Sequence, residues 1–324
     1  GYLPKEYQEE YEILGIGGVA GVVECMHCKM ETLGTTKLKL HGYAMGEDKK
    51  VINTTYLHAK PRKFSSRRRK RNYKVILSIG SGMDSGKTTT AAYLCRGLNN
   101  DGHKVGFVKL TGTVYSKDKH FVKDCGAHKV VDFSTVGFPS TYMCEKEELL
   151  DLYETLLRKV STIKPDYVVV EIADGLMQRE TKMLLSSGYF RRTIDGVILS
   201  GGDSMSVLNG VDFLRNRRLP PFAIGGLVNV APLFVKELQK TLPEIPVLDL
   251  DGLARGKNAK LMERATKERE KLENAYQKEK DRKEKQREKR RIAREKRAAA
   301  KQEKELIDKE AEPLEPISEG EIVG

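Results

Sequence analysis

Apolar residues between positions 73 and 252 alternate between short continuous runs and helical spacing. The run at 73–77 is β-branched and apolar, as in a buried parallel strand, and the spacing at 90–98 suits a helix. Leucines at 149, 152, 156 and 157 predict a helix over 145–162. Further strands are predicted at 104–110, 129–133, 166–172, 195–200, 222–224 with 227–228, and 246–249. The alternation predicts an α/β fold: a mostly parallel sheet flanked by helices, with ligands at the carboxyl ends of strands.

The segment between the run at 73–77 and the helix at 90–98 is rich in glycine. It reads Ser78-Ile79-Gly80-Ser81-Gly82-Met83-Asp84-Ser85-Gly86-Lys87-Thr88-Thr89. Five residues separate Gly80 from Gly86, one more than in the commonest Walker pattern. A glycine-rich loop that ends in Gly-Lys-Thr at a helix start places backbone N–H groups where they bind a polyphosphate.

This loop predicts a nucleoside triphosphate site, and the domain is therefore interpreted as a P-loop NTPase. Lys87 would reach the β and γ phosphates, and the Thr88 hydroxyl would face Mg²⁺. The predicted nucleotide-binding residues of the loop are Gly82, Met83, Asp84, Ser85, Gly86, Lys87, Thr88 and Thr89.

The rest of the chain divides by composition. Residues 1–58 contain short runs at 13–24 and 37–42 broken by glycines, which predicts a small β-rich module that either stands alone or packs on the next domain. A basic linker at 59–72 leads into the nucleotide-binding domain at 73–254. A charged helical extension follows at 255–310, and a disordered tail is predicted at 311–324.

The formal charge of +12 is concentrated in two segments. Residues 60–71 carry eight Lys and Arg and no acid, while 255–310 carry 22 Lys and Arg against 13 Asp and Glu. Both segments are interpreted as solvated; the alternative is weak, salt-sensitive contact with nucleic acid or an acidic protein. A sustained heptad of apolar residues is absent from 255–310, which favours a solvated helix over a coiled coil.

Hydropathy and cysteine usage predict a cytoplasmic protein without a membrane contact. No apolar run approaches a membrane span, and no secretory signal is visible. Five scattered cysteines do not suggest a disulfide framework. Cys25 and Cys28 form a lone Cys-x-x-Cys, which a zinc site would have to complete with His41 or a second subunit.

The loop resembles that of dethiobiotin synthetase and its relatives, in which five residues likewise precede Gly-Lys-Thr. The resemblance extends through roughly residues 74–250 in the order of the parts. It implies that Lys109, at the end of the second strand, contacts phosphate and substrate, and that Glu171 binds Mg²⁺. Asp118 is the nearest match to a further carboxylate of that family, with Asp124 as the alternative, and Asn229 matches a residue that contacts the base. The chain departs from that family at 172–176. The family has a short glycine-alanine-glycine run there that helps to shape the substrate site, whereas this chain reads Ile-Ala-Asp-Gly-Leu.

Several side chains around the loop are candidates for chemistry. Lys87 and Lys109 would neutralise charge on a transferring phosphoryl group. Asp84 is a further catalytic candidate if it points toward the metal or, as loop residues do in this superfamily, across a dimer interface. Asp174, Arg179 and Glu180 are candidate substrate residues; Arg179 and Glu180 equally suit a first helical turn. Residues 203 and 204 suit a helix N-cap.

Three functions are compatible with these patterns. The first is a Mg²⁺-dependent ATP-binding protein, with GTP as the alternative nucleotide, that hydrolyses ATP or activates an unknown small molecule such as a carboxylate. The second is a nucleotide-dependent homodimerising switch or scaffold that presents its basic tail to nucleic acid or a protein. The third is a GTP-dependent metallochaperone that uses Cys25 and Cys28.

Overall fold

The computed structural model describes residues 1–2, 4–15, 17–65 and 71–310. The tail predicted at 311–324 and positions 66–70 of the basic linker lie outside the described residues. The chain forms two compact units, Gly1–Arg269 and Glu270–Gly324, and each is described by itself.

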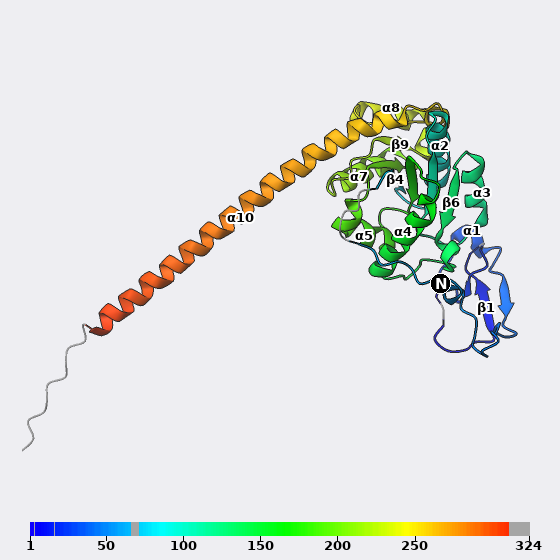
Figure 1. Ribbon diagram of the computed structural model, residues 1–324, viewed down its shortest axis with the longest axis horizontal. Coiled ribbons are helices and arrows are strands. Elements are labelled where there is room, and N and C mark those ends of the chain that lie inside the picture. The colour runs from blue at the N-terminus through cyan, green and yellow to red at the C-terminus, as the bar shows by residue number, and fades with distance from the viewer. Residues whose placement is uncertain (3, 16, 66–70, 311–324) are drawn as a thin grey trace, which may run out of the picture. The chain divides into compact units, whose positions relative to one another are not determined.

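A six-stranded parallel sheet forms the centre of the first unit, in the order β6-β5-β7-β4-β8-β9 (Figure 1). Its strands are β4 (Lys74–Gly80), β5 (Val105–Lys109), β6 (Lys129–Asp132), β7 (Tyr167–Glu171), β8 (Gly196–Ser200) and β9 (Ala223–Gly225). The chain passes from β4 to β5 across the position of β7, and from β7 to β8 across β4. The carboxyl ends of β7, β4 and β8 therefore lie side by side at a topological switch point, where ligands bind in open α/β sheets.

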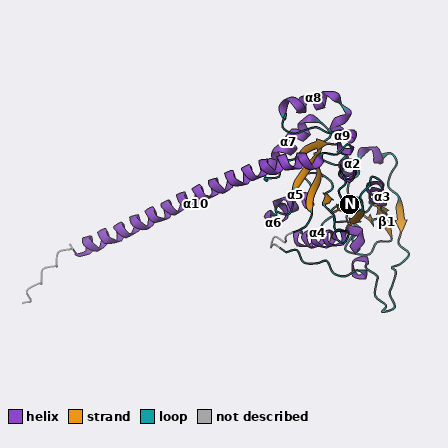
Figure 2. Cartoon of the chain, turned by 45° about the horizontal axis from the view of Figure 1, so that its top comes forward, coloured by secondary structure: helices purple, strands orange, loops and turns teal. Residues whose placement is uncertain are grey.

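Helices cover both faces of this sheet, as the arrangement of purple helices and orange strands in Figure 2 shows. Alternate strand residues point to opposite faces: Val75 and Leu77 pack with α4 and α7, whereas Ile76 packs with α2. The helices are α2 (Lys87–Asn100), α3 (Ser116–Asp124), α4 (Lys146–Ser161), α5 (Arg179–Ser186), α6 (Gly188–Arg191), α7 (Ser204–Arg215), α8 (Pro232–Thr241) and α9 (Leu250–Ala254).

The predicted sheet is confirmed except at its last edge. Residues 227–228 lie in a 3-10 turn, η3 (Leu227–Val230), because Gly226 turns the chain with a φ of 91°. The strand predicted at 246–249 is wrong: Val247 makes only one parallel bridge, to Ile224. Pro246 has no N–H to extend the ladder, and Asp249 already caps α9 by accepting from the amide of Gly252.

The N-terminal module is a small antiparallel sheet in the order β2-β1-β3, which confirms the predicted β-rich unit. Its elements are β1 (Glu10–Ile13), β2 (Ala20–Gly21), α1 (Cys28–Glu31), β3 (Lys37–Lys39) and a 3-10 turn η1 (Thr54–Leu57). The module packs on the next domain, because the Thr54 hydroxyl donates to the carbonyl of Gly137 at 2.7 Å. That carbonyl follows a second 3-10 turn, η2 (Phe133–Val136).

The described part of the basic linker is attached along α4. The amide of Phe64 donates to Asp151 Oδ1 at 2.7 Å, and its ring packs against the core of the domain. Beyond positions 66–70, Arg71 pairs with the buried Glu154 at 3.2 Å. The half-buried Asp151 and the buried Glu154 thus fix this part of the linker in place.

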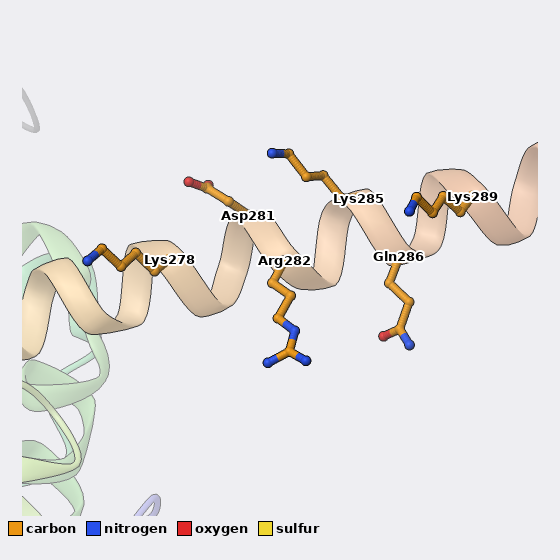
Figure 3. Close-up of a pocket in the computed structure, with 6 residues that line it drawn as sticks. All are labelled: Lys278, Asp281, Arg282, Lys285, Gln286 and Lys289. Atoms are coloured by element: carbon orange, nitrogen blue, oxygen red, sulfur yellow. The ribbon is translucent and has the colours of Figure 1, made fainter.

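Helix α10 (Asn258–Glu310) begins in the first unit and forms the described part of the second, which confirms the predicted long charged helix. In the second unit it is stabilised by pairs such as Glu279–Lys283 at 2.5 Å. The side chains of Asp281 and Lys285 project to one side of the helix and those of Arg282 and Gln286 to the other (Figure 3). Of the helices in the described residues, none combines the length and apolar character needed to cross a bilayer.

Candidate functional site

The glycine-rich loop leaves a row of backbone donors open. In the described part of the chain, none of the eight amides of residues 82–89 donates a hydrogen bond. Gly86 stands before α2 with a φ of 86°, a left-handed conformation that turns the loop into the helix. The Lys87 ammonium folds back over the loop and donates to the carbonyl of Gly82 at 2.7 Å. Open amides, a helix N-terminus and a cation together suit a bound anion.

Two glycines outside the loop allow the neighbouring chain to approach it closely. A Cβ on Gly175 would lie 2.6 Å from Gly82 Cα, and one on Gly226 would lie 2.2 Å from the carbonyl oxygen of Ser85. The loop is therefore confined between the segments that follow β7 and β9. Neither glycine was predicted as a site residue. The sequence feature that could have identified Gly226 is the pair of adjacent glycines at 225 and 226, directly after the strand predicted at 222–224.

The structure brings together four predicted residues at the carboxyl ends of β5 and β7. The Thr88 hydroxyl donates to Glu171 Oε1 at 2.8 Å, and Lys109 Nζ lies 3.9 Å from the same oxygen. Lys109 and Glu171 pair in register on neighbouring strands, so their side chains share one face of the sheet. Lys109 also donates to Asp118 of α3. Asp118, rather than Asp124, is thus the carboxylate beside this site.

Burial shifts the pKa values of these groups. Burial raises the pKa of Glu171 above its ordinary value, and Lys109 and the hydrogen bond from Thr88 offset only part of that effect. Burial lowers the pKa of Lys87 despite the nearby carboxylates. For Lys109, burial alone would lower the pKa, but Glu171 and Asp118 outweigh it and the pKa is raised. Lys109 is therefore neutralised within the protein, whereas Lys87 is a desolvated cation that a phosphate would stabilise.

The donor set fits Mg²⁺. Glu171 Oε2 is buried and has no hydrogen-bond partner, and it belongs to the same carboxylate that accepts from Thr88. Among the described residues there is no group of three or more His, Cys, Asp and Glu that could hold a metal ion. Mg²⁺ commonly takes one or two carboxylates and completes its shell with substrate phosphates and water, so one buried carboxylate beside a hydroxyl suits it.

Two further carboxylates, those of Asp174 and Asp84, influence the pKa values of the lysines at this site. Asp174 is half-buried, and its charge raises the pKa of both Lys87 and Lys109. Asp84 is exposed at the turn of the loop, with a φ of 55°, and its charge acts on Lys87. Both aspartates thus lie within electrostatic reach of the site; their roles in substrate binding and catalysis stay predictions.

Arg179 and Glu180 form the first turn of α5, as the second interpretation of them predicts. Arg179 donates to the carbonyl of Cys144 at 2.8 Å and pairs with Glu145 at 3.0 Å. Glu180, which is buried, accepts from the amide of Met143 at 3.0 Å. These contacts hold the segment that precedes α4, and a role in substrate binding stays a prediction.

Asn229 lies in η3, beside the confined loop. Its side-chain amide donates to the carbonyl of Leu248 at 3.0 Å and to that of Gly226 at 3.3 Å. It therefore joins the segments after β9 and before α9, and its contact with a nucleotide base stays a prediction. Asp203 caps α7 by accepting from the amide of Ser206 at 2.8 Å, which confirms the predicted N-cap.

Cys25 and Cys28 lie in the N-terminal module and are exposed. Cys28 Sγ lies 3.8 Å from Nδ1 of the neighbouring His27. A metal site completed by His41 or by a second subunit stays a prediction.

No protein-family model matches the sequence. Among curated proteins, none has a similar sequence. Solved structures that match include the signal recognition particle receptor FtsY of Elizabethkingia anophelis in complex with GDP, with 13% identity over 60% of this chain and 62% of that chain and a TM-score of 0.39. Chloroplast FtsY of Physcomitrella patens has 14% identity over 60% and 64%, with a TM-score of 0.40.

The 54 kDa signal recognition particle protein of Aeropyrum pernix K1, in complex with GDP, has 19% identity over 66% of this chain and 43% of that chain. Its TM-score is 0.33. The chain spans less than two thirds of the length of each of these proteins. A likeness this weak identifies neither a family nor an activity.

Replacing Gly226 with alanine should destabilise the protein, because its φ of 91° and ψ of −163° suit only glycine and the new Cβ would overlap Ser85. We expect the free energy of unfolding in urea to fall by about 2–3 kcal/mol. Gly202→Ala is the matched control, since a Cβ there meets nothing within 4 Å. Equal losses from the two variants would contradict the close approach of the loop.

Replacing Glu171 with glutamine should change how stability depends on pH. Because the pKa of Glu171 is raised, the folded chain retains its proton at pH values where the unfolded chain has lost it. The free energy of unfolding of the unaltered protein therefore falls as pH rises through that window, and Glu171→Gln removes this fall. Denaturation from pH 4 to 8 measures it, with the exposed Glu47→Gln as control. Parallel profiles for the unaltered protein and Glu171→Gln would contradict the raised pKa.

Proposed function

We propose that this chain binds a Mg²⁺-bound nucleoside triphosphate at residues 82–89 and catalyses transfer or hydrolysis of the γ-phosphoryl group. The row of open amides closed by the Lys87 ammonium is the observation that carries this proposal. Unpaired amides at the edge of a domain are costly unless a ligand or water satisfies them. A triphosphate supplies several anionic oxygens along such a row.

Each side chain near the loop has a task in this reaction. The loop amides and Lys87 hold the phosphates and stabilise negative charge. Thr88 and Glu171 are the residues that would hold Mg²⁺, which when bound supplies charge neutralisation at the phosphate oxygens. Lys109 is held by Glu171 and Asp118 beside the same site and provides a second ammonium there.

The acceptor of the phosphoryl group is proposed to be a small molecule such as a carboxylate, or water. This follows the resemblance to dethiobiotin synthetase, in which the lysine that Lys109 matches contacts substrate. Thr111 fixes the segment beside Asp174, since its hydroxyl donates to the carbonyl of Ala173 at 2.8 Å and accepts from the amide of the same residue at 2.9 Å. Asp174 and Lys109 would then present opposite charges to a polar substrate.

Calorimetry with ATP and with GTP, each with Mg²⁺, tests the proposed function. We expect association with at least one of the two, and ATP is the proposed nucleotide. Lys87→Ala should weaken binding about tenfold to a hundredfold, because charge-assisted hydrogen bonds to phosphate contribute about 1.5–3 kcal/mol.

The exposed Lys240→Ala makes the same change of charge on α8 and should leave affinity unaltered. No heat with either nucleotide, or equal affinity for Lys87→Ala and the unaltered protein, would contradict the proposed site.

A nucleotide-dependent homodimerising switch is the second candidate, and exposed apolar side chains favour it. They lie on the loops and helix starts that follow β4, β6, β7 and β8, and each is 59–68% exposed: Met83, Tyr142, Met143, Met177 and Met205. All of these segments leave the same edge of the sheet, where the phosphate site lies. Flexible methionines at an exposed edge suit contact with another protein surface.

Measuring molar mass by light scattering with and without nucleotide tests this second candidate. We expect ATP or GTP to convert a monomer to a dimer, and the pair Met83→Glu and Met177→Glu to prevent this by placing carboxylates in the contact. Leu33→Glu, which alters a still more exposed side chain in the N-terminal module, is the control. A mass that nucleotide does not change would exclude the switch while leaving the enzymatic proposal intact.

A further inference from the structure

A groove of about 420 Å³ lies between the basic linker and α4, apart from the phosphate site. Five of its eight lining residues are basic when histidine is included, and none is acidic: His58, Ala59, Lys60, Arg62, Val136, Thr155, Arg158 and Lys159. Single-sign charge concentrated in a concavity raises the local concentration of a ligand of opposite charge.

The walls of this groove are fixed. Thr155, Arg158 and Lys159 are spaced i, i+3 and i+4 on α4 and therefore share one face of that helix. The linker is joined to this face because the amide of Arg62 donates to the Thr155 hydroxyl at 2.7 Å. On the other side, the bond from Thr54 to the carbonyl of Gly137 holds the turn that leads to the groove.

The four long cations of the groove are available to a ligand. In the part of the chain that the structure describes, Lys60, Arg62, Arg158 and Lys159 take part in no ion pair. By contrast, Arg71 of the linker pairs with the buried Glu154 of α4. Four like charges gathered without a carboxylate repel one another, and a polyanion would relieve that repulsion.

An exposed aromatic ring stands next to the groove in the sequence. Tyr56 is 83% exposed and belongs to η1, two residues before His58. An exposed aromatic side chain beside a track of cations is the combination by which proteins bind single-stranded nucleic acid: the cations follow the backbone and the ring stacks on a base. A purely acidic peptide would use the cations but would gain nothing from the ring.

We propose that this groove binds a single strand of nucleic acid. Lys60, Arg62, Arg158 and Lys159 contact consecutive phosphates, and Tyr56 stacks on a base at the end of the track. The site is separate from the phosphate loop and does not depend on the proposed NTPase activity.

The basic stripe of α10 is a competing source of the same chemistry. Lys278, Arg282, Lys285 and Lys289 recur at intervals of three and four residues, so their backbone positions lie along one stripe of that helix. The Lys285 side chain leans to one edge of this stripe and that of Arg282 to the other (Figure 3). The experiment must therefore measure the groove and the stripe separately.

Fluorescence anisotropy of the full chain with a labelled 15-nucleotide oligothymidylate, without ATP, tests the proposal. Across 50–200 mM salt, log K against log salt should slope by about −0.7 for each phosphate that the protein neutralises. The paired substitution Arg158→Gln with Lys159→Gln should therefore weaken binding and make the slope shallower by about 1.4. Tyr56→Ala should weaken binding at least fivefold with little change of slope.

Two further variants complete the design, and the first of them matches the groove variant in charge. Lys236→Gln with Lys240→Gln removes two exposed cations from α8 and should leave both affinity and slope unchanged. Replacing Lys278, Arg282, Lys285 and Lys289 with glutamine should leave the effect of the groove substitutions intact. Nucleotide calorimetry on each variant confirms that the first unit is folded.

Three outcomes would overturn the proposal. In the first, the variant Arg158→Gln with Lys159→Gln binds the oligonucleotide as tightly as the unaltered protein. In the second, the α10 stripe variant loses all binding. In the third, Tyr56→Ala has no effect and polyglutamate competes as well as unlabelled oligonucleotide, which would assign the groove to an acidic protein instead.

Discussion

The open amides of residues 82–89 are the constraint around which the α/β domain is arranged. A loop whose amides donate no hydrogen bond within the described chain gains no stability from those donors, so its conformation depends on its neighbours. The segments after β7 and β9 pack against the loop. They can approach it this closely because Gly175 and Gly226 have no Cβ. The strand order places β7 directly beside β4 and β9 on the other side of it, one strand beyond β8, and all of these strands end at the edge of the sheet where the loop lies.

Charge around the loop is divided between a cluster of paired groups and Lys87. Lys109 pairs with the half-buried Asp118 and with the buried Glu171. The Lys87 ammonium donates to the carbonyl of Gly82, and burial lowers its pKa. A bound phosphate would offset that effect of burial, whereas it would change the paired groups far less. Ligand binding and proton binding at Lys87 are thus expected to reinforce each other.

Strand positions and the meeting of Thr88, Glu171, Lys109 and Asp118 could be predicted from the sequence. Apolar runs identify strands locally, and parallel strands bring their carboxyl ends to one edge whatever their order. The approach of Gly226 to Ser85 could not be predicted, because it depends on how two distant segments pack.

The last predicted strand failed for a related reason. Residues 246–249 have the composition of a strand, but pairing at the sheet edge is limited by Pro246 and by the start of α9. The contact of Arg179 with the carbonyl of Cys144 could not be predicted either, because the two residues lie far apart in the sequence. Local pattern predicts elements and their ends, whereas these contacts are properties of the packed chain.

The described residues of α10 beyond Arg269 form one long helix. At 1.5 Å per residue, an unbroken helix from 270 to 310 is about 60 Å long. Ion pairs and a hydrogen bond between neighbouring turns of its own surface add to the stability of this helix within the second unit. Dissolved salt screens such pairs, and the extension would then behave less as a rod and more as a tether. Ionic strength thereby sets how far from the folded domain its end can act.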